Sequence, residues 1–122
     1  MSDEFLRVAR QEIQEELNEI EQIMALCNND ERLFAKSQSI EEHLHKIKGL
    51  APMIGHGEIG EIAKISYDIL KHIINEGVLP GSYFFMLEIV DDMKKILLGF
   101  DTYDITKFKK LTREKFPAVS DL

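Results

Sequence analysis

Cysteine, proline and tryptophan are scarce in this sequence of 122 residues, which has one cysteine, three prolines and no tryptophan. The single cysteine, Cys27, cannot form an internal disulfide, and this favours a reducing compartment. The low proline content argues against long linkers, and we find no repeats. The polar, acidic start MSDEFLRVARQEIQEEL is unlike a secretory signal, and no apolar run approaches the roughly 20 residues that cross a bilayer. We therefore expect a cytoplasmic protein.

Positive charge is also in deficit, with 15 Lys and Arg against 22 Asp and Glu and a formal net charge of −7. A field of this sign repels nucleic-acid phosphates and anionic lipid, so we expect neither a nucleic-acid nor a membrane partner. The chain has no Gly-rich phosphate loop and no paired CxxC, so we expect no nucleotide site of its own and no cofactor. The basic run KFKKLTREK is short, and we interpret it as a solvated helix face.

What the sequence does contain is apolar residues at helical spacing along almost its whole length. They predict helices over about 3–27, 30–54, 57–76, 82–98 and 104–115, and no segment has the period-two alternation of a strand. The short connections predict an all-α fold, an antiparallel up-down four-helix bundle with a short fifth helix, forming one domain over 1–122. We expect Ser2 and Ser82 to cap their helices and Pro52 to loosen the end of the second. The expected core includes Cys27, Met24, Met53, Met86 and Met93, with Ile105, Phe108 and Leu111 inward on the fifth helix.

One segment of the second predicted helix, HLHKIKGLAPMIG, combines a histidine with a glycine on the same face. His45 lies about 100° round the helix from Leu44, a residue of the apolar face, so its ring should stand at the edge of that face and reach solvent. Lys48 and Gly49 follow three and four residues later and therefore share its strip. A glycine inside an exposed helix destabilises the helix by roughly 1 kcal/mol relative to alanine. Gly49 therefore indicates that the space in front of the His45 imidazole is kept open for a docking protein.

The residue types on this strip suit an anionic adduct on the histidine. A neutral imidazole is a good nitrogen nucleophile near pH 7, and it readily releases a phosphoryl group to a carboxylate. Lys48 adds a positive charge beside the ring. A lone surface histidine beside lysine and glycine also arises by chance in many helices, but a purely structural bundle would leave Gly49 unexplained. The strip therefore indicates a surface that carries a phosphoryl group on His45.

The sequence HKIKGLAPMIG resembles the signature of histidine-containing phosphotransfer domains, where a His is followed by a hydrophobic residue, Lys-Gly, a small residue and a further Gly. The resemblance is greatest to the N-terminal phosphotransfer domain of chemotaxis histidine kinases and covers nearly the whole chain. It implies that His45 accepts the phosphoryl group on Nε2, that Lys48 assists, and that the protein relays the group without being a kinase itself. It also implies a monomer whose partners are a receiver (response-regulator) domain and the catalytic domain of a histidine kinase. We expect partners to dock on a surface that comprises Glu41, Glu42, Gly49, Pro52, Gly55 and His56.

The chain departs from that branch of the family on the third helix. The branch usually places a glutamate there, which hydrogen-bonds the other ring nitrogen of the phosphoacceptor. In an ungapped comparison this position is Tyr67, with Asp68 next and Lys64 one turn before. A phenol is a possible partner of His45 but cannot match a carboxylate, so phosphorylation should be slower. The alternative for Tyr67 is an amphipathic residue that fills a groove of the bundle. The alternative for the whole protein is a docking module that binds a receiver or kinase domain without being phosphorylated.

Metal binding is the other chemistry that the histidines raise. Glu42 and His45 form an E-x-x-H pair, the spacing of di-iron helix bundles, but such sites need a second pair and two further glutamates. No second E-x-x-H occurs in the sequence. His43 and His45 are about 200° apart on a helix and cannot share a metal. We therefore expect no metal site, and we interpret Cys27 as a buried, inert thiol.

Overall fold

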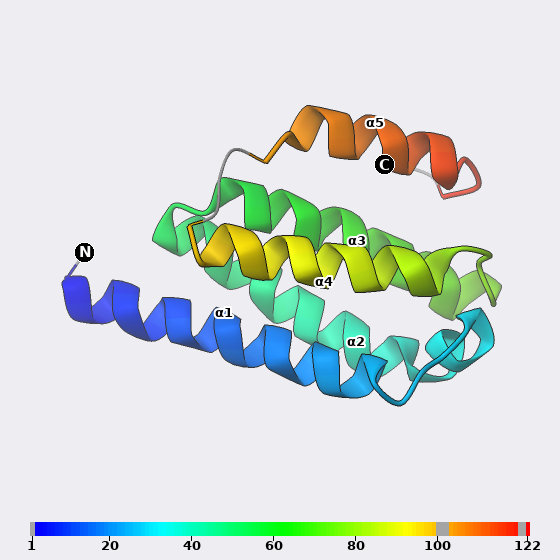
Figure 1. The fold of residues 1–122 in the computed structure, drawn as a ribbon, viewed down its shortest axis with the longest axis horizontal. Helices are drawn as coiled ribbons and strands as arrows, with labels where there is room; N and C mark the ends of the chain where they lie inside the picture. Colours follow the sequence, from blue (N-terminus) through cyan, green and yellow to red (C-terminus); the bar gives the residue numbers. More distant parts are fainter. Residues whose placement is uncertain (1, 100–102, 120–121) are drawn as a thin grey trace.

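The computed structural model describes residues 2–99, 103–119 and 122, and within these residues it contains helices and no strand (Figure 1). Its elements are α1 (Asp3–Met24), α2 (Asp30–Leu50), the 3₁₀ turn η1 (Ala51–Ile54), α3 (Gly57–Glu76), α4 (Ser82–Leu97) and α5 (Ile105–Lys115). α1 and α3 each pack against both α2 and α4, so the four long helices close a bundle. α5 packs on α3, on the side of the bundle away from α1 (Figure 1). The predicted four-helix bundle with a short fifth helix is confirmed.

The helix ends follow the local signals in the sequence. The Ser2 hydroxyl accepts the Phe5 N–H at 3.1 Å and caps α1, as predicted, and the Asn29 side chain caps α2 by accepting the Arg32 N–H at 2.8 Å. Pro52 does interrupt this helix, but α2 ends at Leu50, four residues before the predicted end, and the chain tightens into the 3₁₀ turn η1 where a loosened turn was expected. Gly55, with φ of 77°, follows η1 and stops it. α1 ends at Met24, three residues earlier than predicted.

The start of α4 contradicts the sequence prediction. Ser82 is the first helical residue, not the cap, and its hydroxyl lies 3.4 Å from Asp30 Oδ1. The free backbone N–H groups at the start of α4 instead find their acceptor on another helix, α2. Asp30, in the first turn of α2, accepts the Gly81 N–H at 3.0 Å and the Tyr83 N–H at 2.8 Å. Asp30 therefore ties the start of α2 to the start of α4.

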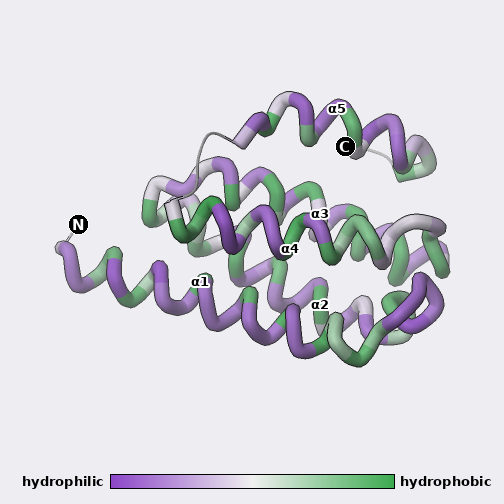
Figure 2. Tube along the Cα trace, viewed as in Figure 1, coloured by the Kyte–Doolittle hydropathy of each residue, from purple (hydrophilic) through white to green (hydrophobic). Residues whose placement is uncertain are grey.

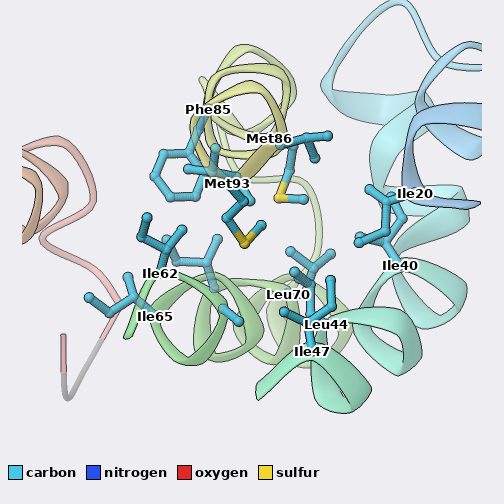
Figure 3. Close-up of a cluster of buried hydrophobic side chains, with 14 of the residues drawn as sticks. Ile20, Ile40, Leu44, Ile47, Ile62, Ile65, Leu70, Phe85, Met86 and Met93 are labelled. Carbon is cyan, nitrogen blue, oxygen red and sulfur yellow. The ribbon is translucent and has the colours of Figure 1, made fainter. Parts of the chain in front are cut away.

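Most of the residues that the helical spacing selected lie in the core. The core also contains five apolar residues that the spacing did not select: Ile65, Leu70, Val90, Phe116 and Val119. Isoleucine, leucine and methionine side chains from all four helices meet in the centre (Figure 3), and hydrophobic segments alternate with hydrophilic ones along the helices (Figure 2). Cys27 is buried although it lies beyond the end of α1. Met53 is 43% exposed and Leu111 is 51% exposed, so their assignment to the core was wrong. On α5 the buried residue is the next one, Thr112, whose hydroxyl donates to the Phe108 carbonyl at 2.7 Å.

Candidate functional site

His45 lies on the outer edge of α2. Leu44 and Ile47, on either side of it in sequence, are fully buried in the core, whereas His45 itself is exposed. The 100° advance per residue turns the imidazole out of the core but keeps it next to the neighbouring helices. The position predicted from the spacing is therefore the observed one.

Toward α3, His45 faces Tyr67. The two ring centroids are 5.6 Å apart, and the ring planes are inclined by 39°. The Lys48 ammonium lies over the same tyrosine ring, 4.2 Å from its centroid, a cation–π distance. Tyr67 therefore lies opposite His45 in the structure. Within the described part of the chain, no carboxylate forms a hydrogen bond or ion pair with the His45 ring.

Toward α1, His45 borders an open hollow in the surface. Glutamates of α1 and the face of α2 around Gly49 line it, and its residues are Glu12, Glu15, Glu16, His45, Lys46, Gly49 and Leu50. A methyl group placed on Gly49 would meet no atom within 4 Å beyond its own helix. The glycine is therefore not required by packing inside this chain, which agrees with the idea that it leaves room for something outside it.

His43 points to the other side of α2. Its Nδ1 lies 2.5 Å from Glu16 Oε2 on α1, and both side chains are largely buried. His43 is thus held against α1 by Glu16, a residue that also lines the hollow beside His45, whereas the His45 ring is exposed and faces Tyr67. No group of three or more histidine, cysteine, aspartate or glutamate side chains among residues 2–99, 103–119 and 122 is arranged to hold a metal ion. The Glu16 contact of His43 was not predicted, because sequence spacing does not show which helix lies opposite.

The remaining residues of the predicted docking surface extend along α2 in both directions from His45. Glu42 is exposed, and the Glu41 side chain, only 13% exposed, pairs with Lys71 of α3 at 3.9 Å. Pro52 and Gly55 are exposed beyond the end of α2. His56 follows them at the start of α3.

His56 is partly buried, and its burial lowers the pKa of its imidazole, with the positive charge of Arg10 acting in the same direction. Sequence reasoning did not identify Lys71, whose ammonium is 5.5 Å from the Tyr67 ring centroid. Its position four residues after Tyr67, on the same face of α3, was the available signal.

In chemical terms, the site presents an exposed imidazole flanked by a tyrosine ring and an ammonium group. An exposed neutral imidazole is a nucleophile, and the ammonium favours an anionic group bound to it.

No described helix is long and apolar enough to cross a membrane.

Comparison with known proteins is informative at the family level. The family model of the Hpt domain matches residues 4–79, a segment that contains all of α1 except Asp3, together with α2, η1 and α3, and therefore His45, Lys48 and Tyr67. Neither the curated proteins nor the solved structures include a significant match to this chain.

Proposed function

The chain belongs to the Hpt-domain family, whose members are intermediates of phosphotransfer in two-component phosphorelays and not kinases, and from this premise we propose that His45 is its phosphoryl carrier. The observation that carries the proposal is the exposure of His45 on α2, with Lys48 beside it and open space over Gly49. The assignment of Nε2 as the reacting atom rests on the family resemblance.

The proposed step is a reversible transfer between nitrogen and oxygen. The lone pair of His45 Nε2 attacks the phosphorus of a receiver aspartyl phosphate, and the bond between phosphorus and the aspartate oxygen breaks. The electron pair of that bond leaves with the carboxylate. In the onward transfer a receiver carboxylate oxygen attacks phosphorus, and the pair of the N–P bond returns to Nε2. The Lys48 ammonium stabilises the negative charge of the phosphoryl group in both directions.

The unobstructed surface around His45 suits a protein that donates or accepts a phosphoryl group. A receiver aspartate has to bring its carboxylate within bonding distance of Nε2, so the surface near the ring has to be free of protruding side chains. Gly49 and the hollow on its α1 side meet this need. The partners we propose are a receiver domain and the catalytic domain of a histidine kinase. The chemotaxis branch is the first one to test, with a cytoplasmic monomer, folded as one domain over 1–122, as the acting species.

The test is transfer of radioactive phosphate from a phosphorylated receiver or an active chemotaxis-type kinase. We expect acid-labile, alkali-stable label on the wild-type chain, and we expect none on His45→Gln. His43→Gln is the matched control, because His43 lies two residues away on the same helix but faces α1. Label that persists in His45→Gln would show that another histidine is the acceptor.

One observation favours a second candidate, a docking module that is never phosphorylated. Tyr67 occupies the place opposite His45 where a carboxylate would assist the imidazole. A chain of this kind would bind a receiver or kinase domain while remaining unlabelled in the same assay. Binding without label, measured by calorimetry alongside the transfer assay, would favour this candidate over the carrier.

A further inference from the structure

Lys71, a residue outside the family signature, lies on α3 one helical turn beyond Tyr67, the residue that His45 faces. Where α2 and α3 run side by side, His45 faces Tyr67 and Glu41 faces Lys71, each pair being four residues along from the other. The Lys71 ammonium is 5.5 Å from the centroid of the Tyr67 ring, on which Lys48 also lies. Two ammonium groups therefore gather at the ring that His45 faces.

Of the lysines near this site that have a carboxylate partner, Lys71 has the longest contact. Lys64 lies 2.8 Å from Asp68, and Lys46 lies 3.7 Å from Glu16. Lys71 is 3.9 Å from Glu41 Oε1, at the outer limit of an ion pair, and its side chain is 50% exposed. Glu41 is largely buried, but because the contact is long and the Lys71 end is half exposed to water, it holds the Lys71 ammonium only weakly.

Phosphorylation of His45 would change the balance of charge around Lys71. A phosphoryl group carries up to two negative charges and three strong acceptor oxygens, whereas Glu41 offers one charge. Glu41 and His45 are four residues apart on α2, which is about one turn or 5.4 Å along the helix. The flexible four-carbon stem of Lys71 spans this distance. The stronger acceptor should then capture the ammonium.

We infer that Lys71 exchanges its contact with Glu41 for the phosphoryl oxygens of phosphorylated His45, so that Lys48 and Lys71 hold the group from two helices. This inference rests on the proposed function of His45. It makes Lys71 a phosphoryl-binding residue and Glu41 its resting partner. It also gives α3 a direct contact with the phosphoryl group at a site where Tyr67 supplies no carboxylate.

The experiment needs no natural partner. Phosphoramidate serves as the donor, since attack by His45 Nε2 on its phosphorus forms the N–P bond as ammonia leaves. The ³¹P resonance that is missing from His45→Gln identifies the phosphoryl group on His45. Its chemical shift is then followed against pH, because a nearby ammonium favours the doubly charged form and lowers the midpoint of the titration.

We expect Lys71→Gln to raise that midpoint by roughly half a pH unit, about a threefold change in the ratio of the two forms. Lys71→Arg should titrate close to wild type, because it keeps the charge. Glu41→Gln should lower the midpoint, since it frees Lys71. Lys64→Gln is the matched control, another α3 lysine held by its own carboxylate.

The Lys71 variants leave the other charged groups around His45 unchanged, so a difference in the titration midpoint is caused by the change at Lys71. These other groups are Glu12, Glu15, Glu16, Glu42, Lys46, Lys48, Lys64 and Asp68. A midpoint in Lys71→Gln equal to wild type, or an equal shift in Lys64→Gln, would overturn the role of Lys71 and leave the phosphoryl carrier intact. Absence of any His45 resonance in the wild type would overturn both proposals.

Discussion

The imidazole of His45 and the phenol of Tyr67 face each other across the contact between α2 and α3, with 5.6 Å between their ring centroids. Tyr67 thus stands where a hydrogen-bonding carboxylate would orient the histidine and stabilise its positive charge during attack on phosphorus. The Lys48 and Lys71 ammonium groups flank the same position. Compared with a site that has a glutamate in place of Tyr67, this site therefore carries more positive charge and lacks a carboxylate to accept the ring N–H of His45.

Replacement of Tyr67 by glutamate should accelerate phosphorylation of His45 by a kinase. The new carboxylate would accept the ring N–H and hold the reactive tautomer, and the two lysines would keep it ionised. Positioned acid–base assistance is typically worth about 10²-fold or more, which sets the expected size of the effect in single-turnover kinetics.

The control for this experiment is Asp68→Glu, one residue further on. Asp68 pairs with Lys64 at 2.8 Å on α3 itself, so the longer side chain should change the rate little. An unchanged rate in Tyr67→Glu would mean that the carboxylate does not reach the ring. Activity that appears only in Tyr67→Glu would identify the natural chain as a docking module.

Substitution of His45 by glutamine should abolish transfer without affecting the fold. The side chain is exposed, and its removal opens no cavity in the core. Surface substitutions usually change the free energy of unfolding by about 0.5 kcal/mol or less. Urea denaturation followed by circular dichroism checks this. A larger loss would mean that His45 supports the bundle itself.

Replacement of Gly49 by leucine should separate stability from transfer. The free energy of unfolding should stay the same or rise by up to about 1 kcal/mol, because the backbone gains helix propensity and a Cβ at this position meets open space. Transfer to a receiver should slow, since the leucine projects into the approach to His45. Gly49→Ala is the control, with the same gain in propensity and a much smaller obstruction. A wild-type transfer rate in Gly49→Leu would refute the clearance argument.

Loss of the Asp30 carboxylate should destabilise the whole bundle. Asp30→Ala would leave the N–H groups of Gly81 and Tyr83 without their acceptor at the start of α4. Loss of a capping side chain costs about 0.5–2 kcal/mol, and we expect the upper half of this range because two helices are joined. Asp104→Ala, which removes the cap of the peripheral α5, should cost less in the same denaturation assay.

The thiol of Cys27 should react slowly in the folded protein. Burial raises the pKa of Cys27 above its ordinary value, and this effect outweighs the positive charges of Lys36 and Arg32, which act in the opposite direction. A raised pKa means less thiolate at neutral pH, roughly tenfold less for each unit. We expect a thiol reagent to label the native chain more slowly than the urea-unfolded chain, and to reach half-maximal reactivity at a higher pH. Because the chain has a single cysteine, all label reports this site.

The sequence by itself determined the helices, most of the core and the exposure of His45. These features depend on local physics, because helical periodicity sets which residues share a face, and serine, asparagine, proline and glycine act on the nearest turn of backbone. The end of α2 shows this most clearly, since Pro52 predicts a disturbed last turn and Gly55 predicts the stop, although the tightening into a 3₁₀ turn was not predicted. The position of Tyr67 opposite His45 was also predicted, but only through resemblance to a family, not from spacing.

Only the tertiary structure decided the contacts between helices. Asp30 capping α4, Glu16 meeting His43 and Lys71 meeting Glu41 join residues that are 51, 27 and 30 positions apart. Periodicity defines a face of a helix but not the register or the partner against which that face packs. The same limit explains the errors at Met53 and Leu111, two apolar residues for which the bundle had no remaining core to fill. Burial depends on the surface that other helices provide, and that surface exists only once the whole chain has folded.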